Sequence, residues 1–149
     1  MATVEVTFTP LPAHVRTARL VATAVARRSG VDEELLDEVR LAVGEACSRA
    51  VEAHRRHCPA EPVKIEMTDQ GERFVVVVSD QAPTGGAAAG ANGHGVATLV
   101  QGADDAAIPA GFGLAVISGL ADDVHVSSTS SGVSVRMSWP SATPATPAG

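Results

Sequence analysis

The feature that most constrains the fold is a continuous apolar run, Phe74 and the four valines after it, in the stretch RFVVVVSD at 73–80. Successive side chains of a strand point to opposite faces of a sheet, so this run is apolar on both faces. We therefore expect it to form a central strand with cover on at least one side. The stretch VKIEMT at 63–68 precedes it, and the turn residues 69–71 between them predict a β-hairpin.

Apolar periodicity predicts the other elements, because alternation is typical of strands and a spacing of three or four residues is typical of helices. In chain order we expect a strand at 3–8, helices at 13–29 and 34–56, the two hairpin strands, a long loop at 81–110, a glycine-led helix at 111–121, and strands at 124–128 and 133–139. The predicted fold class is α/β, a two-layer sandwich with the helices on one face of a mixed, mostly antiparallel sheet.

A chain of 149 residues, 45% of them apolar, is long enough and apolar enough for one domain with its own core. We assign residues 1–139 to this domain. The remaining stretch, PSATPATPAG at 140–149, is low in complexity and is expected to be a disordered tail. The loop at 81–110 is rich in glycine and alanine, and a loop of this length is typical of a functional lid or a disordered excursion.

The charge balance and the cysteines exclude several classes of function. A formal net charge of −6 argues against a nucleic-acid-binding protein, whose affinity comes mostly from a basic surface. No apolar run reaches the ~18 residues that a membrane helix needs. Cys47 and Cys58 form no C-x-x-C pair or cysteine–histidine cluster, so we expect no metal site. Sparse thiols, and a start that is not basic and then apolar, predict a cytoplasmic protein.

The polar side of the helix at 34–56 carries two pairs at i,i+4 spacing, Glu45 with Arg49 and Glu52 with Arg56. Glutamate precedes arginine in both pairs, which is the favourable order on a helix. Each pair contributes ~0.3–0.5 kcal/mol. Without further context, surface ion pairs that stabilise the helix are the simplest interpretation.

Two other residues of this helix depart from a plain amphipathic pattern. A glycine inside a helix costs roughly 1 kcal/mol relative to alanine, so Gly44 indicates close approach of another backbone or of a ligand. The helix is predicted to pack on the sheet through an apolar stripe made of Leu36, Val39, Val43, Cys47, Ala50 and His54. His54 lies near the helix end of this stripe, which is typical of a partly buried, hydrogen-bonded histidine.

Two weaker signals flank the long loop. Asp80 ends the apolar strand, where aspartate is commonly a turn former. Gly111 and Gly113 open the stretch GFGLAVISGLADDV at 111–124, and the free backbone N–H groups of a helix start are a natural seat for phosphate. Each signal alone is equally typical of an ordinary turn.

In this order, the helix with Glu45, the strand that ends at Asp80, the glycine-rich loop and the glycine-led helix resemble the ATPase superfamily of DNA gyrase, the large heat-shock chaperone, histidine kinases and MutL (GHKL). Within it, the sequence is most similar to the bacterial anti-sigma serine kinases, from VEVTF to VRMSW. The most specific match is the second glycine box, G-x-G-L-x-x-[IV], at Gly111, Gly113, Leu114 and Ile117. The first box, D-x-G-x-G, is matched at Asp80 only, with Ala82 and Thr84 in the glycine positions.

The resemblance implies a general base at Glu45, which would activate the attacking hydroxyl, and an adenine-reading carboxylate at Asp80. It implies ATP as the cofactor, a sigma factor and/or an anti-sigma-factor antagonist as partners, and a homodimer. The cofactor-binding residues that it predicts are Arg49, Asp80, Ala82, Gly111, Gly113 and Leu114.

Arg49 is where the sequence departs from the family pattern. The family motif E-x-x-x-N places there an asparagine whose carbonyl oxygen binds magnesium, and arginine has no acceptor atom. Arg49 is expected to repel the metal, to bind phosphate directly, or to pair with Glu45. Because phosphoryl transfer relies on a metal for charge stabilisation, we predict an ATP-binding regulator with weak or lost kinase activity. An active serine kinase and a nucleotide-free interaction scaffold are the two alternatives.

Overall fold

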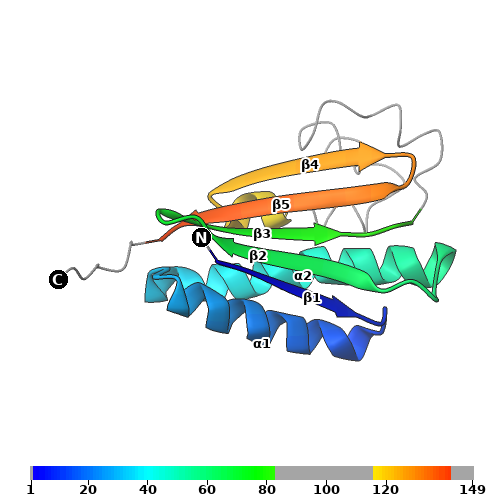
Figure 1. The fold of residues 1–149 in the computed structure, drawn as a ribbon, viewed down its shortest axis with the longest axis horizontal. Coiled ribbons are helices and arrows are strands. Elements are labelled where there is room, and N and C mark those ends of the chain that lie inside the picture. The colour runs from blue at the N-terminus through cyan, green and yellow to red at the C-terminus, as the bar shows by residue number, and fades with distance from the viewer. Residues whose placement is uncertain (1, 83–115, 142–149) are drawn as a thin grey trace.

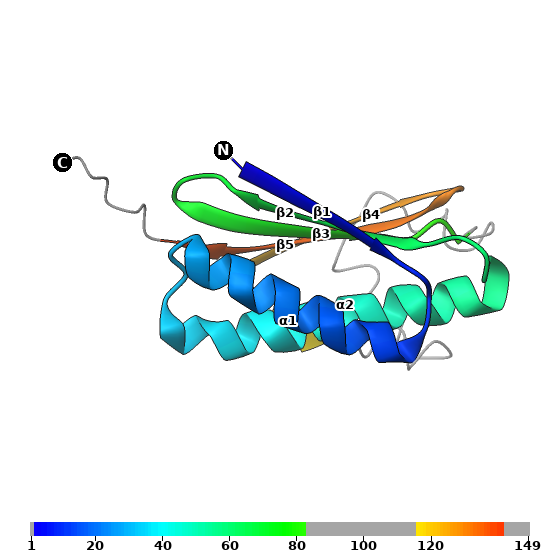
Figure 2. The same ribbon diagram turned by 60° about the horizontal axis from the view of Figure 1, so that its bottom comes forward.

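The computed structural model describes residues 2–82 and 116–141, and within these ranges it contains two long helices and five strands. In chain order the elements are β1 (Ala2–Phe8), α1 (Pro12–Arg28), α2 (Glu33–His57), β2 (Val63–Asp69), β3 (Arg73–Ser79), β4 (Asp123–Thr129) and β5 (Gly132–Pro140). Residues 116–120 form a further helical segment. Helices α1 and α2 lie side by side against one face of the sheet (Figure 1, Figure 2).

The five strands form one sheet in the order β1-β2-β3-β5-β4. β3 lies in its centre, as the apolar run predicts, with Val76 opposite Met67 of β2 on one side and Met137 of β5 on the other. Every pairing among the described strands is antiparallel. The expected two-layer α/β architecture is therefore confirmed.

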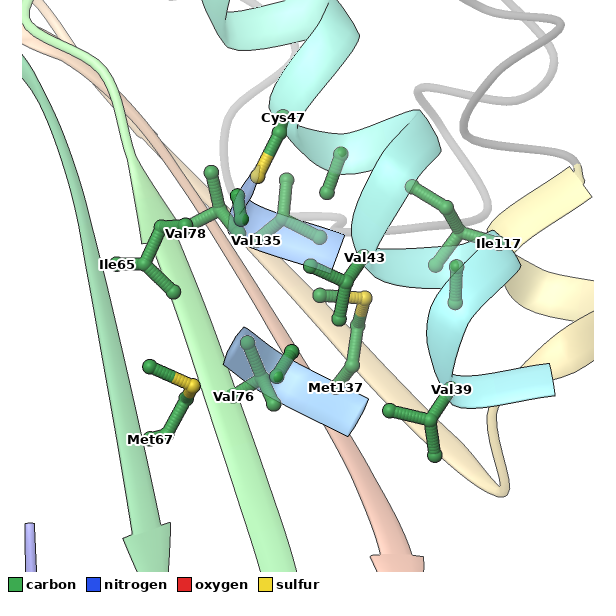
Figure 3. Packing of buried hydrophobic residues seen from close by; sticks show 14 of the residues in the cluster. Val39, Val43, Cys47, Ile65, Met67, Val76, Val78, Ile117, Val135 and Met137 are labelled. Carbon is green, nitrogen blue, oxygen red and sulfur yellow. The ribbon is translucent and has the colours of Figure 1, made fainter. Parts of the chain in front are cut away.

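The core lies between the sheet and the helices. Figure 3 shows Val76 and Val78 of β3 on the side of the sheet that faces Val43 and Cys47 of α2, and all four side chains are almost completely buried. An apolar side chain of this size contributes about 1.5–3 kcal/mol when it is fully buried. The apolar stripe predicted for the second helix is confirmed by the buried residues of α2, which include Leu36, Val39, Val43, Cys47, Ala50 and His54.

The start of α2 follows from its capping residue. Asp32 accepts a hydrogen bond from the backbone N–H of Glu34 at 2.9 Å, which satisfies one of the free donors of the first turn. In the middle of the helix, Gly44 makes room for a side chain of α1: a Cβ there would lie 2.6 Å from Cδ of Arg19. The neighbour at Gly44 is therefore the side chain of Arg19, and not the backbone or ligand that the sequence predicts.

The described part of the predicted third helix, residues 116–120, is helical and packs on the core. Ile117 is fully buried, and the carbonyl of Leu120 accepts a 3.1 Å hydrogen bond from the indole N–H of Trp139 in β5. The glycines that open this helix in the sequence, most of the predicted lid and the tail from residue 142 lie outside the described residues. Within the described part of the chain, no helix is both long and apolar enough to cross a membrane.

Candidate functional site

Asp80 is the first residue after β3, and its carboxylate is held by three donors from three parts of the chain. Only 1% of its side chain is exposed. Nη2 of Arg49, on α2, donates to Asp80 Oδ2 in an ion pair. The other oxygen, Oδ1, accepts from the backbone N–H groups of Ala82 at 3.1 Å and of Val133 at 3.2 Å. These contacts fix the carboxylate between α2 and the start of β5.

The ion pair compensates the burial of both charges. The side chain of Arg49 is 14% exposed, so the guanidinium lies at the edge of the buried region and the Asp80 carboxylate lies inside it. A buried carboxylate without a partner is strongly unfavourable, and removal of one member of a buried ion pair typically costs about 3–5 kcal/mol. The pair thus ties the end of β3 to α2.

The surface ion pair predicted between Glu45 and Arg49 is wrong. Glu45 is half-buried, and within residues 2–82 and 116–141 it forms no ion pair. The physical reason is that buried Asp80 needs a cation, whereas Glu45 keeps contact with water. The equivalent pair of Glu52 and Arg56 does form, at 3.4 Å, on the exposed side of α2.

One buried nitrogen of Arg49, Nε, has no hydrogen-bond partner among the described residues. The guanidinium is therefore held through a single nitrogen and not through the bidentate fork of the strongest arginine–carboxylate pairs. A buried unpaired donor typically costs about 1–3 kcal/mol.

His54, about one turn beyond Arg49 on α2, holds the next residue of the same segment. It is fully buried, and its Nε2 accepts a 2.8 Å hydrogen bond from the backbone N–H of Gln81. Nδ1 lies 2.8 Å from the carbonyl oxygen of Glu61, so Nδ1 carries the hydrogen and donates to it. The neutral imidazole therefore connects the end of α2 to the residue after Asp80.

Gly132, the first residue of β5, permits the close approach of this segment to the β4–β5 hairpin. A Cβ at Gly132 would lie 2.0 Å from the carbonyl oxygen of Asp80. The backbone N–H of Asp80 donates to the carbonyl of Val133 at 2.9 Å. Any larger residue at 132 would push the Asp80 segment away from the hairpin.

An open depression of about 490 Å³ lies beside Asp80, lined by Asp80, Gln81, Ser127, Thr129, Ser131, Gly132, Val133 and Ser134. Ser127 and Ser134 are opposite each other in the sheet, and their neighbours Val126 and Val135 belong to the core. Because side chains alternate along a strand, the two serines point away from the helices. Neither Glu45 nor Arg49 lines the depression, and of the predicted site residues that the structure describes only Asp80 does.

The structure brings together three of the predicted site residues, Arg49, Asp80 and Ala82, and Ala82 is buried at 4% exposure. Glu45 lies one helical turn before Arg49 on α2, and its role as a base stays a prediction. The predicted phosphate-binding residues Gly111, Gly113 and Leu114 lie outside the described residues. Among the residues that are described, no cluster of three or more histidine, cysteine or acidic side chains has the arrangement of a metal site.

Sequence reasoning missed the parts of the site that depend on contacts across the fold. The hydrogen bond from Gln81 to His54 joins residues 27 positions apart, and no local pattern predicts it. A buried histidine on the apolar stripe was the available signal, and it indicates a hydrogen bond without naming the partner. Sequence reasoning also missed Gly132, because the backbone that it accommodates comes from the end of another strand.

Comparison with known proteins agrees with this architecture. The family model of the histidine kinase-like ATPase domain matches residues 8–139. Among solved structures, the chain is similar to the RsbU and RsbW domains of Rv1364c from Mycobacterium tuberculosis, with a TM-score of 0.65 and 15% sequence identity over 97% of this chain and 34% of that chain. At this identity the likeness shows the fold, and the chain spans about a third of the length of that structure's chain. The comparison with curated proteins finds no match.

Proposed function

The chain belongs to the histidine kinase-like ATPase domain family, and from this membership we propose that it is a cytoplasmic regulatory protein of the anti-sigma type. Its partner is a sigma factor or an anti-sigma-factor antagonist, and its kinase activity is weak or lost. Membership of an ATPase domain family implies nucleotide binding, and similarity to the anti-sigma group implies a homodimer.

The partner class is supported by the sequence and by the fold. The second glycine box and the helix that carries Glu45 resemble the anti-sigma serine kinases over nearly the whole chain. The solved structure that is similar over 97% of this chain contains an RsbW domain. The acidic balance of the chain, with a net charge of −6, fits a protein that binds another protein rather than DNA.

The observation that carries the loss of kinase activity is the buried Arg49–Asp80 ion pair. Phosphoryl transfer depends on metal ions that neutralise charge on the phosphates. Arginine has no acceptor atom and cannot bind a cation, and in this structure the guanidinium of Arg49 is paired with Asp80. The proposed base, Glu45, would therefore work without a metal ligand one turn away on α2.

Direct binding measurements test the partner class. The immobilised chain is exposed to each purified sigma factor and anti-sigma-factor antagonist of the same genome, and binding is followed by interferometry. We expect saturable binding to at least one of them, with the same Kd for Glu45→Gln, because docking does not need a base. Failure of the whole panel to bind would defeat the proposal.

The same proteins serve in a phosphotransfer assay with labelled ATP and magnesium. We expect little or no label on the antagonist from either the wild type or Glu45→Gln. Magnesium-dependent transfer by the wild type that disappears in Glu45→Gln would instead establish the alternative, an active serine kinase.

A further inference from the structure

The residues at the Asp80 site do not fit the magnesium nucleotide that the family implies. Position 49 offers no oxygen for a metal ion. At Asp80, Oδ1 already accepts two backbone hydrogen bonds, from Ala82 and Val133. Oδ2 is the oxygen left for a ligand, and Arg49 occupies it. With 1% of the Asp80 side chain exposed, no room remains beside the guanidinium for a second donor.

We propose that Arg49 is an intramolecular competitor of the nucleotide base, which keeps Asp80 closed until the ligand displaces the guanidinium. The inference rests on the proposed function for nucleotide binding, and on the family resemblance for the expectation that the base lies at Asp80. The amino group of adenine is a neutral donor, whereas the guanidinium is charged, and charge-assisted hydrogen bonds are roughly twice as strong as neutral ones. Arg49 therefore has the advantage for Asp80 Oδ2 in the ligand-free chain.

The Arg49–Asp80 contact can also break without displacing Asp80. Arg49 holds Asp80 through Nη2 alone, and its buried Nε has no acceptor among the described residues. The side chain of Arg49 is 14% exposed, so its guanidinium lies beside solvent and can leave by rotation about its own side-chain bonds. Asp80 stays in place when this happens, because its bonds to the backbone of Ala82 and Val133 do not depend on Arg49. The Asp80 carboxylate is thus held in position to accept a hydrogen bond from a ligand, and the exchangeable guanidinium of Arg49 blocks it.

Removal of the guanidinium tests the competition. Arg49→Met keeps most of the aliphatic stem and deletes every donor. Adenosine and ATP are titrated into wild type and variant by calorimetry, with a chelator present to exclude magnesium. Because one charge-assisted hydrogen bond is removed from the competing state, we expect Arg49→Met to bind adenosine about tenfold or more tightly than the wild type.

Arg56→Met is the matched control. Arg56 lies on the same helix and forms an ion pair with Glu52 at 3.4 Å, and 65% of its side chain is exposed. Its removal changes the net charge as Arg49→Met does and leaves Asp80 untouched. We expect wild-type adenosine affinity in this variant, so an equal gain in both variants would show a general charge effect and overturn the inference.

Two other outcomes also overturn it. If Arg49→Met binds adenosine no more tightly than the wild type, or if neither protein binds adenosine, Arg49 does not compete at Asp80. Weaker ATP binding in Arg49→Met, with no change for adenosine, assigns Arg49 to the phosphates. If Arg49→Met does not fold, Arg49→Gln removes the charge and keeps a neutral amide donor near Asp80, and a smaller gain in adenosine affinity in the same direction is expected.

Partner binding by the same variants separates this inference from the proposed function. If the wild type binds a sigma factor or antagonist but Arg49→Met gains no adenosine affinity, the proposed competition of Arg49 with the base is wrong and the proposed function stands. A gain in adenosine affinity in a chain that binds no protein partner supports the competition and defeats the regulatory assignment.

Discussion

At the scale of single residues, the buried thiol of Cys47 gives the chain a defined pH dependence. Burial raises the pKa of Cys47 from an ordinary value of 9.0 to about 12, and the charge of Arg19 acts in the opposite direction. Because the folded pKa lies above the unfolded one, the folded chain holds this proton more tightly. Cys47 therefore contributes stability that is complete below about pH 9 and is lost as the pH rises towards 12.

We expect the free energy of unfolding to fall by ~1 kcal/mol per pH unit above about pH 9. The chain has no tyrosine, so few other groups titrate in this range. Urea unfolding at neutral and at alkaline pH measures the slope. Cys47→Ala should remove most of it. Cys58→Ala should retain most of it, because burial raises the pKa of the half-buried Cys58 thiol as well, but Cys47 is fully buried. A slope that persists in Cys47→Ala would contradict the assignment.

Single residues also show how much of the candidate site can be predicted from the sequence. The sequence singled out Glu45, Arg49 and Asp80, because each has a motif position and a chemistry. It did not pair Arg49 with Asp80, which lie 31 residues apart. Helical spacing describes only neighbours on the same helix, so Glu45 was the partner that the pattern offered. Burial decides between the two carboxylates, and the burial of Asp80 depends on how β3, β5 and α2 meet.

At the scale of elements, α2 positions the site because it contacts the end of β3 through two side chains. Arg49 holds the side chain of Asp80, and His54 holds the backbone of Gln81. The elements themselves were predictable: both long helices and all five strands lie where period 3.6 and period 2 place them, within a few residues. The contacts between these elements were not predictable, because periodicity shows which face of an element is buried but not which residue it contacts.

Removal of His54 tests this role of α2. His54→Ala leaves the N–H of Gln81 and the carbonyl of Glu61 without their partner, in addition to a cavity. We expect a loss of about 2–4 kcal/mol in the free energy of unfolding, measured by urea titration. His57→Ala is the control, since His57 is on the same helix and exposed, and it should cost less than about 0.5 kcal/mol. Equal effects of the two substitutions would show that the His54 hydrogen bonds contribute nothing measurable.

At the scale of the whole molecule, the sheet and the helices share one core. The buried cluster includes residues from both helices, from β2, β3, β4 and β5, and Ile117 from the helical segment at 116–120. The two-layer arrangement followed from the sequence, because amphipathic helices need a sheet face to cover. The strand order β1-β2-β3-β5-β4 was not predictable, since the turn signal at 69–71 pairs β2 with β3 and leaves open which of β4 and β5 pairs with β3.

A single shared core predicts that the described elements unfold together, and the only tryptophan of the chain reports on this. Trp139 is 1% exposed, and its indole N–H donates to Leu120 at 3.1 Å. Its fluorescence therefore senses whether the segment at 116–120 is docked, whereas far-UV circular dichroism follows all helices and strands. We expect coincident urea midpoints from the two signals, as for a two-state domain. Ile117→Ala should lower both midpoints together, by about 2–4 kcal/mol of unfolding free energy, because it leaves a cavity in the common core. A fluorescence transition at lower urea than the dichroism transition would mean that the segment detaches before the rest of the fold melts, and the single-core description would then fail.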